Sequence, residues 1–365
     1  MGEAIIELNG NEATLPCASA LERQTDPSLI PHRLQRLFDL VGARPDDRFV
    51  FTSSGAEAVN QVLWSVFLEV SRKVGKCHFI TSALEDAPTM QMLKRLEDLG
   101  CFVKIAPLNS QGQIDLEQLA LLINPRTALI SVAMAQGLSG VIQPVEEIGA
   151  LAKAKGVLLH LDAAQATGKY YFSFAELDAD YLTFSGDLIH SVAGSGGLFA
   201  KKEAPLVPLI LGGKGLRGGS FDIPSFLSLC AAAQQCSLFL DNMSLEVARL
   251  RDLFEREVAR LIPGAKPLFR DALRLPHTTV IAFPRVHQEA LQYLLEKKVK
   301  GSIGGQYSQH LSSLLASSGV ENPECAVSFA LSRMTTEEDV TRAAQEIARA
   351  VTTLQFISHG VFDGV

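Results

Sequence analysis

Residues 156–198 read GVLLHLDAAQATGKYYFSFAELDADYLTFSGDLIHSVAGSGGL, and they predict two neighbouring strands of one sheet. Val157–Leu161 is an apolar run that ends in Asp162, which is typical of a buried parallel strand. Tyr181–Phe184 is a second such run, and it ends in Ser185. Ligand sites in open α/β sheets lie at the carboxyl ends of the strands. The stretch therefore predicts a polar, cofactor-sized site that includes Asp162, Gln165 and Ser185.

Strand and helix patterns alternate on the N-terminal side of this stretch. The expected strands are 49–52, 78–81, 102–105 and 128–134, and the expected helices are 58–74, 88–99, 115–122 and 145–155. Repeated strand–helix–strand units produce a mostly parallel sheet with helices on both faces. The sequence therefore predicts the α/β class.

The C-terminal third has a different pattern. A long apolar stripe predicts a helix from Pro224 to about Ile262, and the following residues mix short strands with helices. Thr335–Asp339 predicts a capping box that starts a final helix. We expect a large α/β domain over 1–225 with an irregular N-terminal segment over 1–48, a bridging helix over 226–262, and a small α+β domain over 263–365.

Composition narrows the classes of function. Hydrophobic residues make up 47% of the 365 residues and charged residues 20%, so the chain can bury a large core. A net charge of -7 argues against nucleic acid and an anionic membrane surface as main partners. The six cysteines are scattered without a CxxC motif, which predicts reduced structural thiols and no metal site. No signal peptide is visible, and the cytoplasm is the expected location.

Ser53–Glu57 is a small-residue turn between a predicted strand and a predicted helix. Backbone N–H groups and the helix dipole at such a turn favour an anion such as a phosphate. The alternative is a strand-to-helix turn that binds no ligand.

These motifs resemble the core of the cysteine desulfurases, in the class V aminotransferase group of enzymes that use pyridoxal phosphate (PLP). In that family the first strand ends in His-Val-Asp-Ala-x-Gln, which stands here as His160–Gln165. The second ends in Ser-x-Ser-Gly-His-Lys, which stands here with Leu188 in the place of the lysine. Ser332–Glu338 resembles the family's Gly-Arg-x-Thr-Thr-Glu-Glu. The resemblance runs from about Phe49 to Val351 and implies a fold type I PLP-dependent transferase.

The resemblance implies roles for the few residues that are retained. Asp162 would pair with the pyridinium nitrogen of PLP, and Gln165 would bond its phenolic oxygen. The phosphate would lie against Ser185 and the turn. The candidates for a vestigial cofactor site are therefore Asp162, Gln165, Ser185, Gly55, Ala56 and Ser220. The alternative for Asp162 is a carboxylate that caps a loop. Whether Lys214 or Arg217 contacts an anion stays open.

More of the chemistry-bearing positions have changed. The lysine that carries PLP as a Schiff base is replaced by Leu188, which has neither a nucleophile nor a base. The other replacements are Asp187 and Asp86 for two histidines, Gly137 for an asparagine, Ala56 for the phosphate-turn threonine, Ser328 for the carboxylate-binding arginine, and Gly305 for the persulfide-forming cysteine. No catalytic residue is assigned.

The leading interpretation is a member of the cysteine desulfurase family that has lost PLP–lysine catalysis and acts as a binding or assembly partner. One alternative is an active PLP-dependent desulfurase or class V aminotransferase. Another is a sensor that binds PLP or another phosphate ligand without a covalent bond. No cofactor is expected, and PLP is expected only if the family activity is retained. The resemblance implies a homodimer, and an active paralogue or another protein is a further candidate partner; no nucleic acid or membrane partner is expected.

Overall fold

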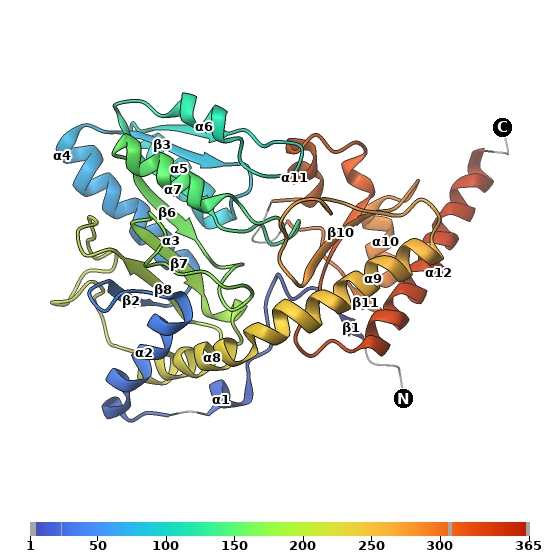
Figure 1. Cartoon of the computed structure of the whole chain (residues 1–365), viewed down its shortest axis with the longest axis horizontal. Helices are drawn as coiled ribbons and strands as arrows, with labels where there is room; N and C mark the ends of the chain where they lie inside the picture. The colour runs from blue at the N-terminus through green and yellow to red at the C-terminus, as the bar shows by residue number, and fades with distance from the viewer. Residues whose placement is uncertain (1–4, 23, 306–308, 363–365) are drawn as a thin grey trace.

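A seven-stranded sheet forms the centre of the larger part of the molecule (Figure 1). The computed structural model describes residues 5–22, 24–305 and 309–362. The strand order is β2-β8-β7-β6-β5-β3-β4, and only β8 runs antiparallel to its neighbours. The strands are β2 (Arg48–Thr52), β3 (His78–Ser82), β4 (Phe102–Ala106), β5 (Thr127–Ala133), β6 (Leu158–Asp162), β7 (Tyr181–Ser185) and β8 (Gly196–Ala200). The expected mostly parallel sheet is confirmed.

Helices cover both faces of this sheet. Apolar residues of α3 and α5 form one core with one face, and residues of α2, α7 and α8 form another core with the opposite face. The main helices of this part are α2 (Ile30–Val41), α3 (Gly55–Val66), α5 (Ala87–Asp98), α6 (Leu116–Leu122), α7 (Val145–Lys155) and α8 (Ile223–Asn242). The short helical segments are α1 (Ala18–Leu21), η1 (Pro27–Leu29), η2 (Phe67–Ser71), α4 (Arg72–Val74) and η3 (Gly186–Leu188).

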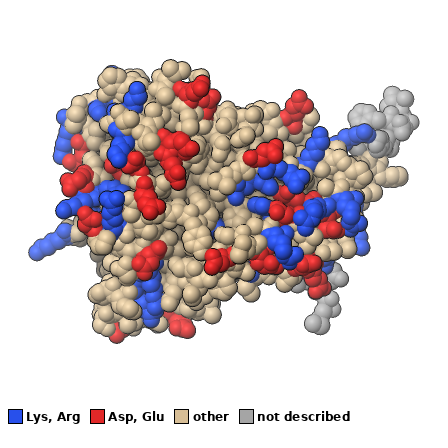
Figure 2. All heavy atoms as spheres, viewed as in Figure 1, with Lys and Arg blue, Asp and Glu red and all other residues tan. Residues whose placement is uncertain are grey.

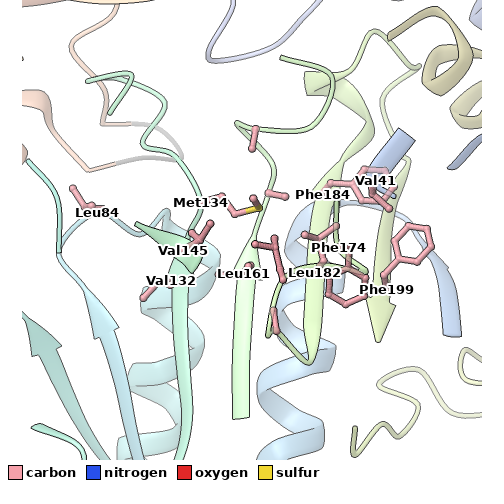
Figure 3. Close-up of a cluster of buried hydrophobic side chains, with 14 of the residues drawn as sticks. Val41, Leu84, Val132, Met134, Val145, Leu161, Phe174, Leu182, Phe184 and Phe199 are labelled. Atoms are coloured by element: carbon pink, nitrogen blue, oxygen red, sulfur yellow. The ribbon is translucent and has the colours of Figure 1, made fainter. Parts of the chain in front are cut away.

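The central strands alternate their side chains between these two cores, as a pleated strand requires. Leu182 and Phe184 of β7 lie in the cluster shown in Figure 3, whereas Tyr181 packs on the α3 side. The Phe199 ring of β8 meets four other aromatic rings, those of Phe38, Phe49, Phe174 and Phe184. Burial on both faces explains why these strands read as continuous apolar runs.

A smaller α+β part contains most of the C-terminal third. Its antiparallel sheet has the order β12-β10-β9, and a parallel pair joins β1 to β11. The elements are β1 (Ile6–Glu7), α9 (Ala248–Leu261), β9 (Lys266–Pro267), β10 (Thr278–Ala282), α10 (Gln288–Leu295), β11 (Val299–Lys300), α11 (Leu311–Ser317), η5 (Pro323–Cys325), β12 (Ala326–Ala330) and α12 (Glu337–Phe362). At the start of α12, Thr336 and Asp339 exchange backbone-to-side-chain bonds, which confirms the predicted capping box.

One nearly continuous helix connects the two parts. It consists of α8, the π-helical turn η4 (Met243–Val247) and α9, and Figure 1 shows it running along both parts. By length and composition alone this helix could cross a membrane, and half of its most apolar window is buried inside the fold. Its contacts with α2 at one end and α12 at the other identify it as a packing element of this fold.

The N-terminal segment differs from its expected irregular form in two ways. Ile6–Glu7 pairs with Val299–Lys300, so it extends the smaller part and not the large sheet. Ile30–Val41 forms a regular helix, because Leu37, Leu40 and Val41 recur at helical spacing and pack on α8. Gly42 ends this helix in the left-handed conformation, with φ of 60°. The expected boundaries at 225 and 262 stay a prediction.

Charge on the face shown in Figure 2 is mixed. Lysine and arginine side chains alternate with aspartate and glutamate over both ends of the molecule, separated by a mostly uncharged middle region. This face therefore presents no broad basic surface of the kind that binds nucleic acid.

Candidate functional site

A cavity of about 540 Å³ lies at the carboxyl ends of β6 and β7, where the sequence predicted a site. Its wall includes five of the six candidate cofactor residues, namely Gly55, Ala56, Asp162, Gln165 and Ser185. Leu188 also lines it. Ser220, the sixth candidate, lies in an exposed loop outside the wall, and Gly304 lines the cavity whereas Gly305 does not.

Asp162 lies at the end of β6, and buried hydrogen bonds between β6 and its neighbouring strands fix its position. The two ring nitrogens of His160 form hydrogen bonds with neighbouring strands. Nδ1 lies 2.8 Å from the Ser131 hydroxyl of β5, and Nε2 lies 2.9 Å from the Thr183 hydroxyl of β7, so the ring links three strands. Burial lowers the pKa of His160 to about 3, so the ring is neutral. Asp162 itself accepts a bond from the Ala164 backbone N–H at 3.0 Å. Its place at the strand end is therefore fixed by the backbone and by the neighbouring strands.

Two backbone N–H groups at the start of α3 form hydrogen bonds with nearby serine side chains. Ser54 caps the helix by accepting a bond from the Glu57 N–H, and the Gly55 N–H donates to the Ser185 hydroxyl at 3.4 Å. Ser185 in turn donates to the Asp187 carboxylate at 2.5 Å. A methyl group on Gly196 of β8 would come within 2.5 Å of the Ser54 carbonyl carbon, so only glycine lets the turn lie this close to the sheet.

Arg217 contacts a carboxylate and not the cavity. Its Nε lies 2.6 Å from Glu57 Oε1, and its Nη2 lies 3.1 Å from Glu57 Oε2. Burial acts to raise the pKa of Glu57, but the bonds from Arg217 and Ser53 outweigh it and keep the pKa below its ordinary value. Lys214 is exposed in the same loop and is not part of the cavity wall. Arg217, whose contact with an anion was an open question from the sequence, is therefore paired with Glu57.

Carboxylates dominate the electrostatics of the cavity. Its described wall contains Glu12, Asp86, Asp162 and Asp187, and no lysine, arginine or histidine. Burial raises the pKa of Asp162 to about 6, and burial together with the nearby Asp162 raises that of Asp86 to about 7. Like charges in a partly buried space disfavour each other and also disfavour a phosphate group.

Leu188 lies in η3 and is largely buried. The loop that carries it is held by the N-terminal segment, because both the backbone N–H and the hydroxyl of Thr14 donate to the Asp187 carbonyl oxygen. Thr14 Oγ1 also accepts from the His190 N–H at 2.8 Å. The loop is thus fixed with an aliphatic side chain on the cavity wall.

Asn11 lines the cavity, and no role was predicted for it from the sequence. Its Nδ2 donates to the Gly137 carbonyl at 3.2 Å and to the Ser328 hydroxyl at 3.3 Å, while the Asn11 carbonyl accepts from Gln165 Nε2 at 3.0 Å. A methyl group on Gly137 would lie 2.7 Å from the Gln165 side chain. Gln165 thus occupies the space that a side chain at 137 would need.

The residues present do not fit PLP bound as a Schiff base. The described wall offers no lysine amine, two donors at the turn (the Gly55 N–H and the Ser185 hydroxyl) already have acceptors, and one of those acceptors is the carboxylate of Asp187. Among the residues that the structure describes, no group of three potential ligands could hold a metal ion, and all six cysteines are free.

Comparison with known proteins gives consistent results. The family model for class V aminotransferases matches residues 34–343. The chain is 32% identical over 328 residues to cysteine desulfurase 2 of Trichormus variabilis, covering 87% of this chain and 81% of that protein. It is 30% identical over 334 residues to cysteine desulfurase NifS of Azotobacter vinelandii, covering 89% and 82%. A solved structure of a NifS-like protein superposes with a TM-score of 0.87 at 26% identity, covering 96% of this chain and 100% of that one.

Proposed function

Because the chain belongs to the class V aminotransferase family and is of the cysteine desulfurase kind, we propose that it is a non-catalytic member that works by binding a ligand or another protein. The observation that carries this proposal is the described cavity wall, where Leu188 and four carboxylates stand and no basic side chain does. A Schiff base requires an amine, and an aliphatic side chain cannot supply one.

Three further positions support the loss of desulfurase chemistry. Ser328 is fully buried and donates to the Leu138 carbonyl at 2.7 Å, so it leaves no room for a carboxylate-binding guanidinium. Gly305 provides no thiol. Asp86 provides no aromatic ring to stack on a cofactor. Gly55, Ala56, Asp162, Gln165 and Ser185 are proposed to shape the wall of a ligand cavity, and the cytoplasm stays the expected location.

The cofactor test is direct. Purified protein mixed with equimolar PLP is expected to show no aldimine absorbance in the near-visible range. After borohydride reduction, mass spectrometry is expected to find no stoichiometric pyridoxyl-lysine, because no described lysine lines the cavity. A stoichiometric adduct at any single lysine would overturn the proposal and favour the active PLP enzyme.

We also propose that the chain forms a homodimer through α8 and the loop at 210–221. Leu211, Phe221 and Leu238 are exposed in these two segments, although large apolar side chains are usually buried. Obligate dimer interfaces bury about 2,000–5,000 Å² and are rich in apolar surface. A second copy related by two-fold symmetry is the commonest way to cover such a surface.

Light scattering at micromolar concentration is expected to give twice the chain mass of 39.4 kDa. Leu238→Asp is expected to shift the mass towards a single chain, because a carboxylate would be desolvated in the interface. Leu121→Asp is the matched control, since Leu121 is exposed to a similar degree but lies on α6. A single-chain mass for the unmodified protein would exclude the homodimer.

A further inference from the structure

Two of the six cysteines lie opposite each other at the start of neighbouring strands. The parallel pairing of β3 with β4 sets His78 opposite Phe102, so the residues just before them, Cys77 and Cys101, are also opposite each other. The Phe102 N–H donates to the Cys77 carbonyl at 2.8 Å, which fixes this register where the strands begin. The pair is hidden in the sequence, because only the register of the sheet brings the two residues together.

The side chains of both cysteines lie on the same face of the sheet. Cys101 belongs to the apolar cluster on the α3 and α5 side, and Cys77 packs against that cluster. Phe79 and Val103, two positions further along each strand, are part of the same packing, as the alternation of a pleated strand requires. Neighbouring strands lie about 4.8 Å apart, and disulfides span Cα–Cα distances of about 4.4–6.8 Å. The register therefore allows a bond between the two sulfurs without a change of strand pairing.

The two thiols differ in their access to solvent. Cys77 is partly exposed, and Arg126 Nη2 donates to its sulfur at 2.8 Å. Arg126 directly precedes β5 on the other side of β3, so it lies in one row with the two cysteines. Reactive thiols are typically partly exposed and lie beside basic side chains. Cys77 is therefore the sulfur that a reagent can reach.

Cys101 has the opposite surroundings. It is 6% exposed, and burial raises the pKa of its thiol, with a further contribution in the same direction from the neighbouring Cys77. A buried thiol of this kind reacts poorly with a reagent in solution. It can still react with a sulfur that is held next to it inside the fold.

We propose that Cys77 and Cys101 form a thiol–disulfide modification site, at which Cys77 attacks a low-molecular-weight disulfide and Cys101 resolves the product. In the first step the Cys77 sulfur bonds to one sulfur of the reagent and expels the other half as a thiol. In the second step the Cys101 sulfur attacks the Cys77 sulfur and expels the bound half. The chain loses two electrons and the reagent gains them, and the two cysteine protons end on the two expelled thiols. This site is separate from the cavity, so it does not rest on the proposed loss of catalysis.

The bond would close a ring of chain that carries part of the cavity wall. The ring runs from 77 to 101 and contains β3, α5 and the wall residues Asp86 and Pro88. It would also tie β4, which lies at the edge of the large sheet, to its neighbour β3. Closing such a ring restricts the unfolded chain, so we expect the oxidised protein to melt at a higher temperature than the reduced protein.

Oxidised glutathione is the probe for this site. Incubation with the reduced, folded protein is expected to lower the chain mass by two hydrogen atoms, and dithiothreitol is expected to restore the original mass. Trypsin digestion without reduction is expected to yield peptides Cys77–Lys94 and Leu96–Lys104 joined by a disulfide.

Single variants test the two roles separately. Cys101→Ala is expected to accumulate one glutathione at Cys77, because the resolving thiol is missing, and alanine suits the apolar surroundings of this position. Cys77→Ser is expected to give neither the joined peptides nor a glutathione adduct at Cys101, because Cys101 is buried. Cys325→Ser is the matched control, since Cys325 is also partly exposed but lies in η5 of the smaller part, and it is expected to give the joined peptides in unchanged yield.

Circular dichroism of each variant verifies that it is folded before the reaction. Four results would each overturn the proposed site. They are a glutathione adduct that persists on Cys77 of the unmodified protein, joined peptides that pair Cys77 with another cysteine, no adduct at Cys77 in folded Cys101→Ala, and a lower melting temperature for the oxidised protein.

Discussion

Placing lysine at position 188 is expected to leave L-cysteine turnover at background, with sulfide and alanine no higher than from the unmodified protein. Active enzymes accelerate their reactions by about 10⁶-fold or more, so the expected difference from an active desulfurase is several orders of magnitude. The physical reason is that catalytic groups which act as a unit contribute little to the rate when their partners are missing. Restoring one group therefore does not restore turnover.

The surroundings of position 188 oppose its restoration. Asp162 and Asp187 line the same cavity, and opposite charges beside an ammonium raise its pKa. A Schiff base forms only from the neutral amine, so the raised pKa would lower the reactive fraction of the amine in Leu188→Lys. Ser328 is buried against the Leu138 carbonyl, and Gly305 carries no thiol, so carboxylate binding and persulfide formation would still be lacking.

Leu188→Met is the matched control for folding, because leucine and methionine have similar volumes and such exchanges are usually tolerated. Both variants are compared by melting temperature, and turnover is measured with PLP in excess. Sulfide release by Leu188→Lys above the Leu188→Met value would show that the remaining groups still form a catalytic unit. Sulfide release by the unmodified protein above background would contradict the proposed loss of catalysis.

The sheet was predictable from the sequence because strands that are buried on both faces appear as continuous apolar runs. The run that ends in Asp162 and the run that ends in Ser185 could be assigned to neighbouring strands without any long-range information. The α2 helix was not predicted, although Leu37, Leu40 and Val41 have helical spacing, because 1–48 was expected to be irregular. Its register becomes clear only from its packing on α8.

The position of the cavity was predictable from the sequence, but the acidic composition of its wall was not. Parallel strand ends meet at one edge, which brought Asp162, Ser185 and Gly55 together as expected. The contact between Gln165 and Asn11 joins residues 154 positions apart, and no local pattern encodes it. Asp86 and Asp187 were recognised as separate replacements of histidines. Their convergence on one acidic cavity depends on the tertiary fold.

Replacing Glu255 with alanine is expected to lower the free energy of unfolding by about 3–5 kcal/mol, because it leaves a buried guanidinium without its counterion. Glu255 Oε1 accepts from Arg274 Nη1 at 2.8 Å and from Thr279 Oγ1 at 2.8 Å. The side chains of Glu255 and Arg274 are only 3% and 6% exposed. Water therefore cannot replace the lost carboxylate.

The segment that contains Arg274 also contacts the larger part of the molecule. The Leu275 N–H donates to the Gly140 carbonyl at 2.7 Å, and the Ile142 N–H donates to the Leu273 carbonyl at 2.8 Å. The turn thus held also contains Gly137 and Leu138 of the cavity wall. We therefore expect Glu255→Ala to disturb this contact as well as to lower the free energy of unfolding, although Glu255 lies outside the cavity wall.

Glu257→Ala is the matched control on the same helix, since Glu257 forms a salt bridge with the exposed Arg260 three residues later. Exposed pairs contribute about 0–1 kcal/mol, so this variant is expected to unfold at nearly the original urea concentration. The double variant Glu255→Ala with Arg274→Ala is expected to recover part of the loss, because it buries no unpaired charge. Far-ultraviolet circular dichroism follows both parts, whereas the fluorescence of Trp64, the single tryptophan, follows α3 of the large part. Equal urea midpoints for Glu255→Ala and Glu257→Ala would show that the buried pair does not hold the two parts together.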